Sequence, residues 1–114
     1  MDIEKTRTEL VREAAEKLEI VGTGQPLEAE YADRIDKNVD PLLLQLAEDG
    51  ICNVASDQNI PSAWFNCIAA LLANISGSLA GREFNPEITV YYESELRRLT
   101  SSSPSYNVLE IEYF

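Results

Sequence analysis

Residues 60–81 read IPSAWFNCIAALLANISGSLAG, and they form the most apolar stretch of the chain. Large apolar side chains recur in it at steps of three and four, which places them along one face of an α-helix. Pro61 suits the first turn of a helix, where no amide donor is needed. The stretch therefore predicts a helix over residues 61–80, buried on several sides at the centre of the fold. Its apolar face comprises Trp64, Ile68, Leu71, Leu72, Ile75 and Leu79.

Length and charge set the class of protein. A chain of 114 residues predicts one domain with a single core. Twenty acidic and nine basic residues give a net charge of −11, which disfavours direct DNA binding and favours solubility. No apolar run is long enough to span a membrane, and residues 1–5 lack the pattern of a signal peptide. We expect a cytoplasmic protein with no membrane partner.

Side-chain chemistry argues against an enzyme. The chain has no histidine, so a Ser-His-Asp triad, a Cys-His nucleophile and a Cys/His zinc site are all excluded. Cys52 and Cys67 are expected to be reduced, with Cys67 packed as a small apolar residue. We predict no catalytic residues, no metal and no cofactor.

The N-terminal third predicts a helix and then a turn. Thr6 and Glu9 have the spacing of a capping box, which predicts an amphipathic helix over residues 7–20. Residues 21–26, VGTGQP, contain two glycines and a proline and predict a turn. Neither a preceding strand nor a nearby basic residue supports a phosphate-binding loop there.

Residues 27–48 present two alternatives because Pro41 lies within a continuous helical pattern. The pattern favours one kinked helix, since a break would usually lose the phase. If two helices form instead, Asp40 caps the second and Pro41 is its first residue. The apolar residues in phase are Tyr31, Ile35, Val39, Leu42 and Leu46.

Carboxylates at helical spacing in the same region also have two interpretations. Glu30, Asp33, Asp36 and Asp40 favour a solvated outer face over a metal site, because no histidine or EF-hand loop accompanies them. Residues 51–54, ICNV, predict a brief extended connection.

Residues 85–99 complete the predicted bundle. Asn85, Pro86 and Glu87 form a helix start, and a helix is expected over residues 86–99. Tyr91 and Tyr92 favour a core or subunit interface over base stacking. The fold prediction is an all-α bundle of about four helices, near 7–20, 28–48, 61–80 and 86–99. Its predicted core includes Leu18, Ile35, Trp64, Ile68, Leu72, Ile75 and Leu96.

The C-terminal residues change from a helical to a strand-like pattern. We assign residues 1–100 to the helical domain and residues 101–114 to a polar linker followed by an extended arm. An alternating apolar strand without an obvious mate needs a partner from outside the domain. The alternative is pairing with residues 51–54 inside the domain. The predicted partner-binding residues are Tyr106, Val108, Leu109, Ile111, Tyr113 and Phe114.

Five segments together resemble the head-to-tail adaptor, or connector, proteins of tailed bacteriophages and phage-like gene transfer agents. They are residues 21–25 (VGTGQ), 40–43 (DPLL), 60–65 (IPSAWF), 71–74 (LLAN) and 97–99 (RRL). The resemblance covers nearly the whole chain and consists of packing and capping patterns. The chain departs from the family at residues 79–81, where LAG replaces the usual Phe-Gly.

The resemblance implies a structural protein of the particle neck. It implies a ring of twelve copies between the portal protein and a tail-side connector or stopper, with DNA passing through without specific binding. Such a protein is cytoplasmic during assembly and part of the virion afterwards. The alternative from the residues alone is a helical interaction module or small regulator that binds a partner through its C-terminal strand.

Overall fold

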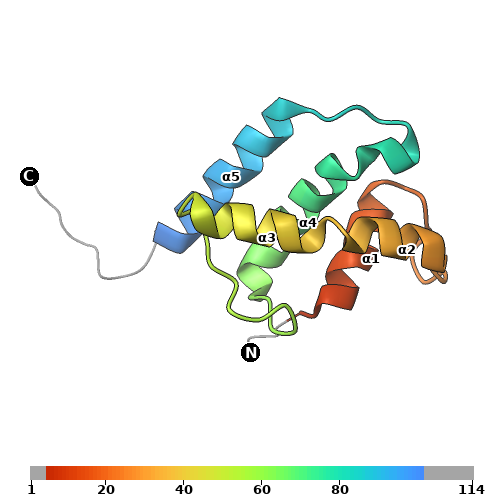
Figure 1. Cartoon of the computed structure of the whole chain (residues 1–114), viewed down its shortest axis with the longest axis horizontal. Helices are drawn as coiled ribbons and strands as arrows, with labels where there is room; N and C mark the ends of the chain where they lie inside the picture. The colour runs from red at the N-terminus through yellow and green to blue at the C-terminus, as the bar shows by residue number, and fades with distance from the viewer. Residues whose placement is uncertain (1–4, 102–114) are drawn as a thin grey trace, which may run out of the picture.

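The computed structural model describes residues 5–101, and every regular element among them is a helix (Figure 1). In these residues the only extended pairing is a backbone bridge between Lys5 and Ile60, and no strand forms. None of the described helices combines the length and the apolar character needed to cross a bilayer. The elements are α1 (Arg7–Lys17), α2 (Ala29–Asp36), α3 (Val39–Glu48), α4 (Ser62–Ile75), the 3-10 helix η1 (Gly77–Ala80) and α5 (Pro86–Ser101).

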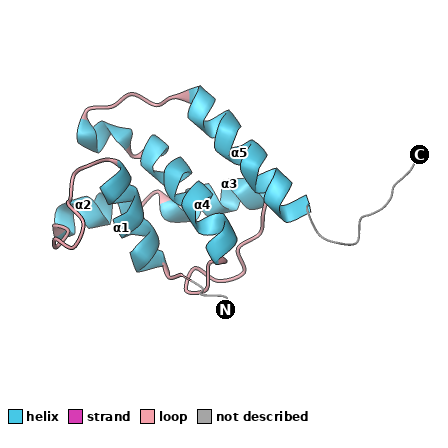
Figure 2. Cartoon of the chain, turned by 180° about the vertical axis from the view of Figure 1, so that it is seen from behind, coloured by secondary structure: helices cyan, strands magenta, loops and turns pink. Residues whose placement is uncertain are grey.

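The helices form two layers. Helices α1, α4 and α5 lie side by side in the view from behind (Figure 2), and α4 contacts both of its neighbours. Helices α2 and α3 cross the other face, with α2 against α1 and α3 against α4 (Figure 1). The apolar side chains between the layers form one continuous core.

Both ends of α1 are fixed by local hydrogen bonds. The predicted capping box is present, because the Thr6 hydroxyl accepts from the Glu9 amide and the Glu9 carboxylate accepts from the Thr6 amide. The helix ends at Lys17, earlier than predicted, and Glu19 takes the left-handed conformation at φ 63°. Bonds from the amides of Glu19 and Ile20 to the last turn complete a Schellman motif. Glycine usually occupies this position. Because a glutamate stands here instead, the sequence gives no sign that α1 ends before residue 20.

The prediction of one kinked helix over residues 27–48 is wrong, since α2 and α3 are separate helices. Pro41 has no amide to donate to the Lys37 carbonyl four residues earlier, and its ring crowds that carbonyl. The break accordingly falls at Lys37 and Asn38. Both residues keep right-handed helical dihedrals, so α2 and α3 continue in nearly the same direction and the apolar phase survives (Figure 1). Asn38, not Asp40, stands at the cap position of α3.

Most of the predicted core is buried, with two exceptions. Trp64 is only partly buried against the core, and Ile75 is 39% exposed. Ile75 is the last residue of α4. Helical phase gives the direction of a side chain, but not whether a neighbouring element extends far enough to cover it. The predicted core residues that are buried are Leu18, Ile35, Ile68, Leu72 and Leu96.

Candidate interaction surfaces

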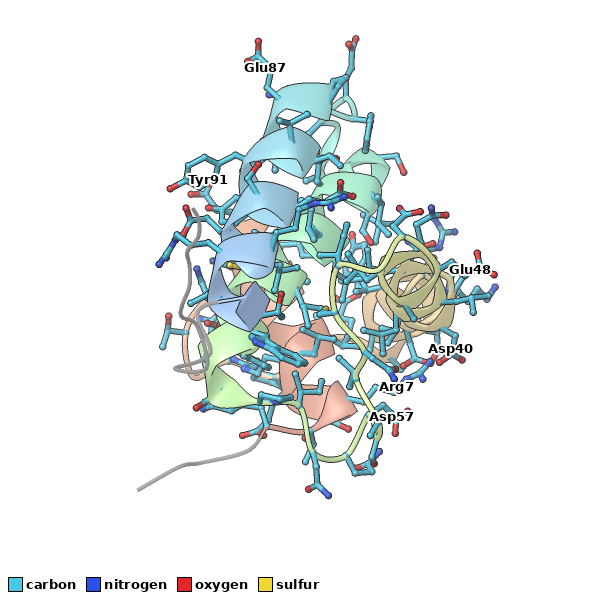
Figure 3. The ribbon with its side chains drawn as sticks, turned by 90° about the vertical axis from the view of Figure 1, so that its left-hand side faces the viewer. Arg7, Asp40, Glu48, Asp57, Glu87 and Tyr91 are labelled. Atoms are coloured by element: carbon cyan, nitrogen blue, oxygen red, sulfur yellow. The ribbon has the colours of Figure 1, made fainter. Side chains whose placement is uncertain are left out.

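Arg7 connects the start of α1 to three carboxylates. Its guanidinium donates to Asp36 at 2.6 Å, to Asp40 at 2.7 Å and to Asp57 at 3.0 Å, and it also donates to the backbone carbonyl of Asp36. Arg7, Asp40 and Asp57 gather on one side of the molecule in Figure 3. The arginine therefore holds α1, the α2–α3 junction and the loop before α4 together.

This cluster gives two of the acids on residues 30–40 a partner within the fold. Asp36 and Asp40 pair with Arg7, whereas Glu30 and Asp33 are exposed, as expected of a solvated outer face. Among the described residues no group of acidic or cysteine side chains is arranged to hold a metal ion. Asp57 was not expected to take part, because its sequence position gives no sign of where its loop returns. The hydrogen bond from Arg7 lowers the pKa of Asp57, and the three carboxylates raise the pKa of Arg7.

Replacing Arg7 with glutamine is expected to lower the free energy of unfolding by about 1 kcal/mol at neutral pH, because the carboxylates are partly solvated. The pKa of Asp57 is lower in the folded state than its ordinary value of 3.8. The ion pair therefore stabilises the fold above that pH, and this stabilisation is lost as the pH falls through the folded-state pKa. The free energies of unfolding of wild type and the variant should therefore differ less below about pH 4 than at neutral pH. Urea unfolding of both proteins across the acid range measures these free energies. A difference in free energy that stays constant with pH would contradict the ion-pair explanation.

Both cysteines are buried and unbonded. Burial raises the pKa of the Cys52 thiol to about 11 and also raises the pKa of Cys67. Because a protonated thiol is a poor nucleophile, neither cysteine is placed for chemistry at neutral pH.

A cleft of about 410 Å³ lies where α1, α4, η1 and α5 meet. Asn74 lies in its wall, and its amide donates to the Asn85 carbonyl and to the Thr89 hydroxyl while its oxygen accepts from the Asn85 amide. Asn85 in turn caps α5 by accepting from the Glu87 amide, as predicted. The polar atoms of Asn74 are thus used to hold the start of α5.

The outer side of α5 is an exposed apolar surface. Val90 is 65% exposed and Tyr91 59%, and together with Pro86 they define what we call the α5 surface. It borders a shallow hollow of about 460 Å³, completed by Glu87, Ser94 and Glu95. The two tyrosines have different environments. Tyr92 packs against the core, whereas Tyr91 points outward (Figure 3). Their rings meet edge to face, with ring centroids 4.9 Å apart. Helical phase had not distinguished their environments.

The predicted partner-binding residues 106–114 lie outside the described residues.

Scans against protein-family models, curated proteins and solved structures each found no match for this chain.

Proposed function

We propose that this chain is a structural head-to-tail adaptor of a tailed-phage-like particle, and not an enzyme. In this proposal twelve copies form a ring between the portal and a tail-side component. The observation that carries it is the compact helical body with an exposed apolar surface on α5, because surfaces of this kind mark protein contacts. The adaptor role and the ring of twelve are inferred from the segments that resemble the adaptor family.

Helix α4 is proposed as the central helix of the bundle. It lies between α1 and α5 and also contacts α3, and every side chain from Cys67 to Asn74 along it is buried. A central helix of this kind would keep the body rigid while its outer helices contact partners.

Residues 106–114 are proposed as the extended arm that docks on the portal as an added strand. Pairing with residues 51–54 is less favoured, because the Ile51 amide already donates to Leu46 and the Ile51 carbonyl accepts from Thr100. An arm leaving the domain would offer its main chain, and Leu109, Ile111 and Tyr113 on one side, to the portal.

The acidic surface is proposed to face the DNA passage in part. Glu28, Glu30 and Asp33 are exposed around α2 and would repel phosphates, which lets DNA move without sticking. Tight binding of duplex DNA by the isolated protein at physiological salt would contradict this part of the proposal.

Deleting residues 104–114 tests the arm. We expect unchanged circular dichroism and an unchanged melting temperature, together with lost attachment to portal-containing heads. A full-length variant with Leu109, Ile111 and Tyr113 replaced by serine is the matched control for chain length, and it should also fail to attach. Unfolding of the deletion variant would favour pairing inside the domain, and normal attachment by either variant would reject the docking arm.

A further inference from the structure

The α5 surface combines apolar side chains with carboxylates. Val90 and Tyr91 are the exposed apolar residues beside the hollow, and Glu87 and Glu95 lie one turn before and one turn after Tyr91. The rise of an α-helix places these two glutamates about 12 Å apart along the helix axis. An apolar side chain that enters the hollow therefore brings its own neighbours close to a carboxylate.

The two glutamates of the hollow differ in their partners. Glu95 already has a cation beside it, because Arg98 donates to its carboxylate at 2.8 Å. Among residues 5–101 the side chain of Glu87 forms no ion pair, and it projects into solvent at the start of α5 (Figure 3). The Glu87 carboxylate is therefore available to a cation that a partner brings.

Charge distinguishes the possible occupants of the hollow. Residues 102–114 of this chain carry two glutamates and no cation. A second copy would offer Leu44, the most exposed large apolar side chain among its described residues outside α5, but Leu44 shares a helix face with Asp40 and Glu48. Either of these occupants would bring carboxylates to carboxylates. A cationic segment brings the opposite charge, and the net charge of −11 attracts it from a distance.

We infer that the α5 surface binds a cationic segment of a partner protein. A large apolar side chain of that segment enters the hollow beside Val90, and a lysine or arginine next to it pairs with Glu87. The exposed ring of Tyr91 offers the same cation a second contact. The inference rests on the proposed function in taking the α5 surface as a protein contact, and it specifies the chemistry of the partner.

Fluorescence anisotropy of a labelled peptide, titrated with the full chain at physiological salt, tests the inference. The probe is an amphipathic peptide of about 14 residues, roughly four helical turns, with leucines on one face and lysines beside them. A second peptide with glutamate in place of each lysine is the matched control. We expect the lysine peptide to bind and the glutamate peptide not to bind. Equal affinity for the two peptides, or no binding of the lysine peptide, would overturn the inference.

Two charge reversals separate the contact at the hollow from the overall charge. Glu87→Lys and Glu48→Lys change the net charge equally, but Glu48 lies on α3, on the side of the molecule opposite Tyr91 (Figure 3). Glu87→Lys should weaken binding of the lysine peptide about fivefold more than Glu48→Lys does. Equal losses would mean that the peptide responds only to net charge, and they would overturn the inference.

Two apolar substitutions test the hollow in the same way. Val90→Ser and Leu44→Ser each shorten an exposed aliphatic side chain, so the circular dichroism of both variants should match wild type. Val90→Ser should weaken binding of the lysine peptide about tenfold, whereas Leu44→Ser should change it by less than about twofold. A greater loss for Leu44→Ser would place the peptide on α3 and overturn the inference.

Two further measurements report on the other occupants. If deleting residues 104–114 strengthened binding of the lysine peptide by about fivefold or more, that segment would already occupy the hollow and the inference would fail. If Val90→Ser dissociated an oligomer of this chain in sedimentation velocity, a second copy would occupy the hollow and the inference would fail.

The peptide titrations use no heads, so they can fail separately from the adaptor function. Attachment of the full chain to portal-containing heads, without peptide binding that depends on Glu87 and Val90, would reject this inference and leave the adaptor function standing. Peptide binding that depends on both residues, without attachment to heads, would support the inference and reject the adaptor function.

Discussion

Leu72→Ala is expected to lower the free energy of unfolding by about 2–5 kcal/mol. Leu72 is completely buried in the C-terminal half of α4, within the core shared by both helical layers. The substitution removes apolar contacts and leaves a cavity that the surrounding helices can fill only in part. Since a domain of this size is stable by about 5–15 kcal/mol, this single change would remove a large fraction of its stability.

The same chemical change at an exposed site is the control. Leu44→Ala on α3 should alter the free energy of unfolding by about 0.5 kcal/mol or less in dilute solution. Urea unfolding of both variants measures the contrast, and equal losses would contradict the placement of α4 in the core. If Trp64 were fully buried, as its place in the apolar pattern predicts, Trp64→Ala would cost about 3–5 kcal/mol. Its partly exposed ring now makes a smaller loss the expected result.

Asn74→Leu is expected to cost about 2–3 kcal/mol, because it removes three hydrogen bonds and leaves the Asn85 backbone groups without their partner. The start of α5 should loosen first, which would appear as faster amide exchange at Glu87. Asn66→Leu on the same helix is the control, since Asn66 is exposed and accepts one hydrogen bond from Lys17. A cost for Asn74→Leu no greater than that for Asn66→Leu would show that the link between α4 and α5 adds little.

Local signals in the sequence predicted much of the fold. The capping box at Thr6, Pro61 before α4 and the Asn85 cap each depend on residues a few positions apart, and each lies at the predicted helix start. The phase of α4 likewise identified Ile68 and Leu72 as buried. Such features are determined within one or two helical turns, so a single sequence contains them.

What the sequence could not predict depends on contacts between distant segments. Nothing near Arg7 indicates that Asp57, in a loop fifty positions later, would return to it. The exposure of Tyr91 depends on where α5 lies against α4, and both tyrosines fitted the apolar pattern equally well. The break between α2 and α3 escaped detection because the two helices stay nearly in line, which keeps Ile35 and Leu42 in phase.

Native mass spectrometry of the full chain mixed with a portal assembly tests the proposed adaptor most directly, because it counts the copies bound. The account predicts a single complex in which a closed ring of twelve copies of this chain joins one portal assembly. When the chain is in excess, no portal assembly should carry a partial ring. A portal assembly that stays bare, or that binds only one or a few copies at saturation, would contradict the account.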